Sequence, residues 1–187
     1  MRYVILFSLF IFKTSNSYNR TRALDYAKKY WNKANHKCNN SYYICSPYGY
    51  FGDEHCNYPS HGGDDAKFVS QCLLAGGHDK IIFPPMYRAS PCGREQIKGT
   101  GLVGVLIKKY GWREACGYHL KPPSMLKPGD VLVQHKGSCN GLDTHSSIVI
   151  EAGKEPKVAS HSKNVYGISY KYLEEDYPYY EWIMYPK

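Results

Sequence analysis

The sequence lacks a long apolar run after its first 17 residues, and this absence argues against a membrane-spanning helix in the rest of the chain. The first residues, MRYVILFSLFIFKTSNS, contain Arg2, an apolar run from Tyr3 to Phe12, and small residues at Ser15 and Ser17. This pattern is typical of a secretory signal peptide. We therefore expect residues 1–17 to be removed and residues 18–187 to form one secreted domain of about 170 residues.

Closely spaced CxxC pairs are also absent, so the seven cysteines do not indicate a structural zinc site. In a secreted chain, cysteines are more typical of disulfides. Cys72 lies within a helical pattern of apolar residues, and we expect it to be the unpaired, buried thiol. The other cysteines can form three disulfides in fifteen arrangements, among which the sequence does not choose: Cys38, Cys45, Cys56, Cys92, Cys116 and Cys139.

No arginine-rich run is present, although the formal net charge is +8. Loss of Arg2 and Lys13 with the signal peptide leaves +6, spread in small groups such as Lys28-Lys29. This distribution favours a solvated basic surface, with attraction to an anionic partner such as a cell wall as the alternative. We predict no nucleic-acid partner, no cofactor and no resident metal, and the oligomeric state stays open.

Helical patterns precede strand patterns along the chain, without an internal repeat or a domain linker. The spacing of apolar residues predicts helices over residues 19–35 and 64–75, the second stopped by Gly76-Gly77, and a short helix that ends near Tyr110. Strand-type composition follows at residues 129–135, 145–153, 156–162 and 179–186. This order predicts an α+β domain with N-terminal helices packed on a C-terminal antiparallel sheet.

One loop-to-helix junction and two histidines stand out as candidates for chemistry. The stretch HGGDDAKFVSQCLLAGG, residues 61–77, places Asp64 and Asp65 at a helix start, where the backbone N–H groups favour an anion. His145 begins a predicted strand and His161 lies in the next one. Because neighbouring antiparallel strands can carry side chains close together, a helix start packed against them would present its first residue to both histidines.

Five segments resemble, in order, those of the putative amidase domain family, within the papain-like group of bacterial wall-cleaving cysteine amidases and peptidases: YNRTRALDYAKKYWN, GGDDAKFVSQCLLAGG, KPGDVLVQ, THSSIVIEAG and ASHSKN. The resemblance implies a papain-like fold. It also implies a nucleophilic cysteine at the helix start, a histidine base on a later strand and a polar orienting residue on the strand after that. In this chain His145 matches the base, and His161 is the candidate orienting residue. Asp65 occupies the cysteine position, and Lys67 replaces an asparagine of the pattern.

The aspartate removes the ordinary nucleophile. A thiolate beside an imidazole acylates readily, whereas attack by the Asp65 carboxylate would form a high-energy mixed anhydride. Cys72 cannot substitute, because it lies about 10 Å further along the helix. We therefore predict a catalytically impaired relative that keeps a groove for an amide or peptide ligand, with the bacterial cell wall as one candidate.

Three alternatives to this interpretation stay open. Asp64 and Asp65 could simply cap the helix, which needs no catalysis. Asp65, His145 and His161 could instead bind a metal that activates water, giving a working amide or peptidoglycan hydrolase. A glycosidase pair formed by Asp64 and Asp65 is the least favoured, because adjacent residues at a helix start point in different directions.

Overall fold

The computed structural model describes residues 17–32, 65–78, 102–139, 144–161 and 163–186. The predicted signal peptide, Asp64 and four of the cysteines lie outside these residues. The helices are α1 (Arg20–Tyr30), α2 (Asp65–Ala75) and α4 (Leu102–Tyr110). The strands are β1 (Arg113–Tyr118), β2 (Val131–His135), β3 (Thr144–Glu151), β4 (Lys157–Ser160), β5 (Val165–Ser169) and β6 (Tyr179–Met184), with a 3-10 helix, η4 (Tyr170–Leu173), before β6. The α+β class is confirmed.

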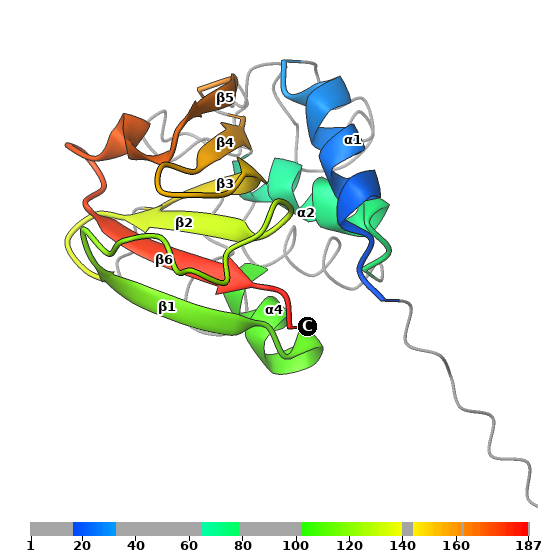
Figure 1. Ribbon diagram of the computed structural model, residues 1–187, viewed down its shortest axis with the longest axis horizontal. Coiled ribbons are helices and arrows are strands. Elements are labelled where there is room, and N and C mark those ends of the chain that lie inside the picture. The colour runs from blue at the N-terminus through cyan, green and yellow to red at the C-terminus, as the bar shows by residue number, and fades with distance from the viewer. Residues whose placement is uncertain (1–16, 33–64, 79–101, 140–143, 162, 187) are drawn as a thin grey trace, which may run out of the picture.

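The six strands form one antiparallel sheet in the order β1-β6-β2-β3-β4-β5 (Figure 1). The last strand in the sequence therefore pairs with β1 on one side and β2 on the other. The four predicted strands are confirmed as β2, β3, β4 and β6, whereas β1 and β5 were not predicted. Both missed strands lie at the edges of the sheet and stay partly exposed, so neither needs an alternating apolar pattern.

The helices begin and end close to their predicted bounds. Asn19 caps α1, where its side chain accepts a hydrogen bond from the N–H of Arg22 at 3.0 Å. The regular helix ends at Tyr30, before the predicted end at residue 35. Gly77 follows α2 with φ +99°, a left-handed conformation that favours glycine and stops the helix.

Two clusters of buried side chains form the core. The larger one joins residues of the three described helices to residues of the sheet. The smaller one joins the sheet to Leu126 and to Tyr170 of η4. Consecutive residues of β2 divide between the clusters, with Val131 and Val133 in the first and Leu132 in the second. This division follows from the alternation of side chains along a strand.

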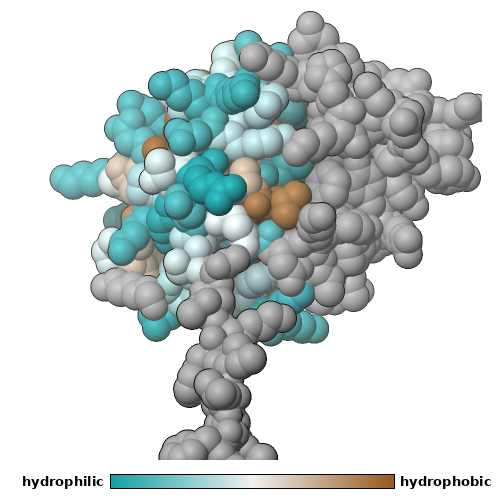
Figure 2. Space-filling model, turned by 90° about the vertical axis from the view of Figure 1, so that its right-hand side faces the viewer, coloured by the Kyte–Doolittle hydropathy of each residue, from teal (hydrophilic) through white to brown (hydrophobic). Residues whose placement is uncertain are grey.

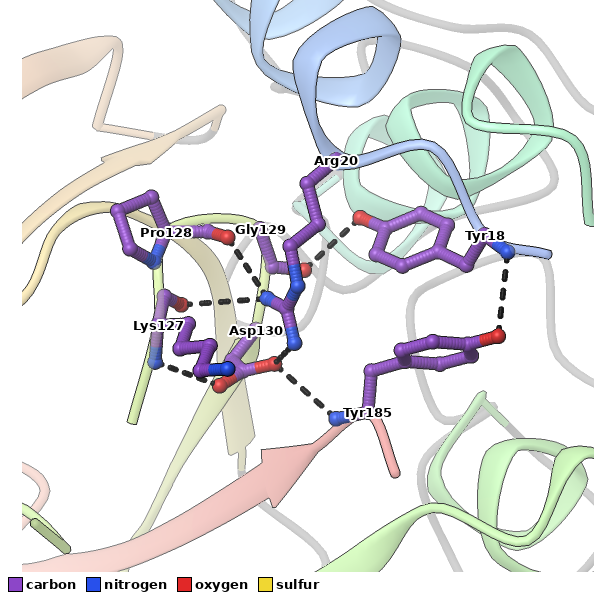
Figure 3. A network of polar contacts seen from close by, with 7 residues as sticks. All are labelled: Tyr18, Arg20, Lys127, Pro128, Gly129, Asp130 and Tyr185. Atoms are coloured by element: carbon purple, nitrogen blue, oxygen red, sulfur yellow. Dashed lines mark hydrogen bonds and ion pairs between the residues drawn. The ribbon is translucent and has the colours of Figure 1, made fainter. Parts of the chain in front are cut away.

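A buried polar network holds the segment before α1 against the turn that precedes β2 (Figure 3). The guanidinium of Arg20 pairs with the fully buried carboxylate of Asp130 at 2.7 Å and donates to the carbonyl oxygen of Pro128 at 2.7 Å. The Tyr18 hydroxyl donates to the carbonyl oxygen of Gly129 at 2.8 Å. These contacts fix the start of α1 on the sheet.

The described cysteines agree with the sequence analysis. Cys72 is a free, buried thiol, and burial raises its pKa, so it has little thiolate character. Cys116 and Cys139 form a disulfide. On the face drawn in Figure 2, the surface of the described residues is largely hydrophilic, with small hydrophobic spots. Within the described ranges, no helix has the length and apolar character needed to cross a membrane.

Candidate functional site

Asp65 and His145, the predicted nucleophile position and base, lie together in the structure. Asp65 is the first residue of α2 and is 4% exposed. Its Oδ2 accepts a hydrogen bond from the backbone N–H of Ser146 at 2.6 Å and lies 3.3 Å from Nδ1 of His145. Because His145 is near the start of β3 and α2 packs on that strand, the helix start meets the imidazole as the sequence predicts.

The other nitrogen of His145 contacts two hydroxyl groups. Ser160, the last residue of β4, places Oγ 2.8 Å from Nε2. Tyr172 of η4 places its hydroxyl oxygen 2.5 Å from the same nitrogen. The imidazole is therefore held between the carboxylate of Asp65 on one side and the hydroxyls of Ser160 and Tyr172 on the other.

His161 has different contacts from those of Ser160. It lies one residue beyond β4, where its Nε2 donates to the carbonyl oxygen of Tyr30 at 2.8 Å and its ring stacks on Phe68 at 4.1 Å between centroids. Consecutive residues at the end of a strand point to opposite sides, so only one of this pair is directed towards His145. Ser160, and not His161, therefore contacts Nε2 of His145, and the orienting role of His161 stays a prediction.

Ser160 and Tyr172 were not among the site residues predicted from the sequence. Ser160 stands directly before His161 in ASHSKN. The motif was therefore present in the sequence, but the orienting role was assigned to His161 and not to Ser160. A register shift lies between β3 and β4, which makes strand parity hard to count from the sequence. Tyr172 reaches the site from η4, and no motif in the sequence marks that element.

Burial controls the protonation of the site. It lowers the pKa of His145 to about 3, and the positive charge of Lys163 adds to this shift. Burial also raises the pKa of Tyr172, and the negative charge of Asp65 adds to that shift. The imidazole is therefore neutral at neutral pH. Its Nδ1–H donates to Asp65, and Nε2 accepts a hydrogen bond from the protonated phenol of Tyr172.

The order carboxylate, imidazole and hydroxyl also occurs in serine hydrolases. In this chain, however, Ser160 is fully buried, and its Oγ is 2.7 Å from the carbonyl oxygen of Ser146 and 2.9 Å from that of His161. A nucleophilic hydroxyl must meet a substrate carbonyl, whereas this one faces backbone carbonyls. The arrangement is a satisfied buried network, with Ser160 in a supporting position.

The three residues of the predicted alternative metal site do not converge. Among the described residues, one group of three ligand atoms lies within 4.8 Å of one another, and it consists of Cys116, His135 and Glu181. Asp65, His145 and His161 do not meet this distance. His161 instead donates to the carbonyl oxygen of Tyr30.

The comparisons with known proteins give a partial match to a family model. No curated protein and no solved structure matches the chain significantly. Residues 17–91, which include α1, α2 and Asp65 but end before β1, match the family model described as "Putative amidase domain".

Proposed function

We propose that this chain is a secreted protein of the amidase family that has lost ordinary cysteine-dependent hydrolysis and binds an amide or peptide ligand, with bacterial cell wall as the first candidate. The match over residues 17–91 supports the family, although it covers less than half of the 187 residues. The apolar leader and the Cys116–Cys139 disulfide support secretion. A papain-like fold is part of this proposal.

The contacts of Asp65 are the observation that carries the proposal. The carboxylate occupies the position at which the family pattern has its nucleophilic cysteine, and it is held by the N–H of Ser146 and by Nδ1 of His145. A thiolate in this place would be activated by the imidazole and the helix dipole. A carboxylate makes the same contacts without the chemistry, because a mixed anhydride is a costly acyl intermediate and an amine is a poor leaving group.

The hydrolysis experiment compares the parent with Asp65→Cys and Asp65→Asn on bacterial cell walls and on small amide substrates. We expect no turnover by the parent or by Asp65→Asn, and measurable turnover by Asp65→Cys. Asp65→Asn keeps the size of the side chain, so it separates lost chemistry from lost folding. Asp25→Asn, at an exposed position of α1, is the matched control. Hydrolysis by the parent that disappears in Asp65→Asn would overturn the loss of catalysis.

Retained binding needs its own measurement. We expect the parent and Asp65→Asn to sediment with purified cell walls equally well, because the proposed groove does not depend on a nucleophile and the Asp65 side chain is only 4% exposed. Release of both by excess soluble wall peptide would support a peptide site. Sedimentation that is unaffected by soluble wall peptide and is abolished by added salt would instead indicate attraction between the basic chain and an anionic wall.

A metal-assisted hydrolase that uses Asp65, His145 and His161 is the alternative from the sequence. Its geometric support is weaker, because His161 bonds the carbonyl of Tyr30 and His145 bonds two hydroxyls. Metal analysis of the purified protein distinguishes the two functions. About one equivalent of transition metal, lost in Asp65→Asn and His145→Gln, would favour the hydrolase.

A further inference from the structure

A second cluster of reactive side chains lies on three neighbouring strands, apart from Asp65 and His145. Cys116 of β1 is the register partner of Glu181 of β6, and His135 comes from β2 on the other side of β6. The sulfur of Cys116, a ring nitrogen of His135 and a carboxylate oxygen of Glu181 lie within 4.8 Å of one another. We call these three residues the strand cluster. Sulfur, imidazole and carboxylate are the usual zinc ligands of proteins.

His135 has unused binding capacity. Its side chain is 3% exposed, and its Nε2 lies 2.5 Å from Oε2 of Glu181. Its Nδ1 is buried and has no hydrogen-bond partner within the described part of the chain. Buried polar atoms are normally satisfied, so this nitrogen needs an explanation. Metal-binding histidines commonly donate one ring N–H to a carboxylate while the other nitrogen binds the ion.

The disulfide prevents binding in the present state. The sulfur of Cys116 is bonded to that of Cys139, and a sulfur in a disulfide is not a thiolate ligand. Both cysteines are partly exposed, so a dithiol reductant can reach them. Its two thiols become a disulfide as two electrons and two protons pass to Cys116 and Cys139. The Cys116 thiol then loses its proton to solvent when a metal binds.

We propose that reduction of the Cys116–Cys139 disulfide turns Cys116 and His135 into ligands of a zinc-class divalent cation, with Glu181 as the hydrogen-bond partner that holds the imidazole. Ligand atoms around a tetrahedral zinc ion lie roughly 3.5 Å apart, so the separations within the strand cluster need only small adjustments. Binding through Nδ1 keeps the hydrogen bond from His135 to Glu181, which then fixes the imidazole. Cys139, with its Cα 6.1 Å from that of Cys116, supplies a second thiolate within reach. This proposal is independent of the proposed amidase-family function.

The experiment uses Cys139→Ser, which frees Cys116 without reducing the other cysteines. Cobalt(II) is the probe, since thiolate binding gives a charge-transfer band in the near ultraviolet. We expect this band in Cys139→Ser and its absence in the oxidised parent. His135→Gln in the Cys139→Ser background should weaken cobalt binding at least tenfold. The matched control is His119→Gln in the same background, because His119 is a partly exposed histidine paired with Glu174 outside the strand cluster.

Each outcome decides the proposal. No charge-transfer band in folded Cys139→Ser, or a band with unchanged affinity after His135→Gln, would overturn it. Circular dichroism establishes that each variant is folded. If Cys139→Ser does not fold, the parent and Cys116→Ser are reduced with a phosphine, which adds no thiol ligand. Equal cobalt binding by these two reduced proteins would then also overturn the site.

Discussion

Two histidines of one sheet each pair with a buried carboxylate, and they differ in the contacts of the ring nitrogen that faces away from it. His145 pairs with Asp65 through Nδ1, and its Nε2 contacts the hydroxyls of Ser160 and Tyr172. His135 pairs with Glu181 through Nε2, and its Nδ1 has no partner among the described residues. The family pattern directs attention to the first pair. The second pair has the unused nitrogen.

This difference determines whether each pair can have a structural role or bind a ligand. A histidine with both nitrogens satisfied is fixed and neutral, which suits a structural network and leaves little capacity for a ligand or a proton. A histidine with one unsatisfied buried nitrogen carries a cost that a ligand can remove. The pair that the family pattern points to and the pair with the unused nitrogen are therefore different.

Removal of Asp65 should have the largest effect. Asp65→Ala leaves the buried N–H of Ser146 and Nδ1 of His145 without their acceptor. We expect the free energy of unfolding to fall by about 3 kcal/mol, measured by urea denaturation at pH 7. Asp25→Ala, at an exposed position of α1, should change it by less than about 0.5 kcal/mol. A similarly small loss for Asp65→Ala would mean that the buried contacts of Asp65 with Ser146 and His145 do not stabilise the fold.

Acid should weaken the first pair. The pKa of His145 is about 3 in the folded protein, against about 6.5 when unfolded, so the unfolded chain binds more protons between these values. The neutral His145 imidazole makes its full contribution to the free energy of unfolding above pH 6.5. This contribution falls by about 1.4 kcal/mol per pH unit towards pH 3. Urea denaturation from pH 7 to pH 5 should show the parent's advantage over His145→Gln shrinking by about 2 kcal/mol.

An exposed tyrosine provides the control for this pH dependence. The difference in stability between the parent and Tyr118→Phe should stay nearly constant over the same range, because Tyr118 is 62% exposed and the substitution removes no imidazole or carboxyl group. A parent advantage over His145→Gln that is constant or grows towards pH 5 would contradict a neutral, buried imidazole at the first pair.

Loss of one hydroxyl should have a smaller effect. Tyr172→Phe removes one partner of Nε2 of His145 and leaves Ser160 in place. We expect a loss of about 1 kcal/mol in the free energy of unfolding, measured by urea denaturation. Tyr118→Phe, at a side chain that is 62% exposed, is the matched control and should have no measurable effect. A loss equal to that of Asp65→Ala would show that the hydroxyl contributes as much as the carboxylate to holding the imidazole.

The smallest effect is expected at the second pair. His135→Gln keeps an N–H donor for Glu181 and removes the unsatisfied nitrogen, so the gain and the loss nearly cancel. The free energy of unfolding of the oxidised protein should change by less than about 1 kcal/mol. His145→Gln should cost more at pH 7, because it disrupts contacts on both sides of the ring. Equal losses in the two variants would remove the distinction between the pairs.

Much of the fold follows from local sequence. The amphipathic spacing and Asn19 specify α1, Gly76-Gly77 end α2, and apolar strands identify the middle of the sheet. The edge strands β1 and β5 could not be read in this way, because an edge strand has one neighbour and tolerates exposed residues. The position of β6 between β1 and β2 depends on long-range pairing that no local pattern encodes.

The sequence by itself determined that Asp65 stands at a helix start, that His145 begins a strand and that Cys72 is buried. Each follows from a local periodicity or a motif. Only the tertiary structure decided that Ser160 faces His145 while His161 faces Tyr30, because strand parity after a register shift depends on the partner strand. The strand cluster is likewise a tertiary feature. Cys116, His135 and Glu181 are far apart in the chain and meet because β6 lies between β1 and β2.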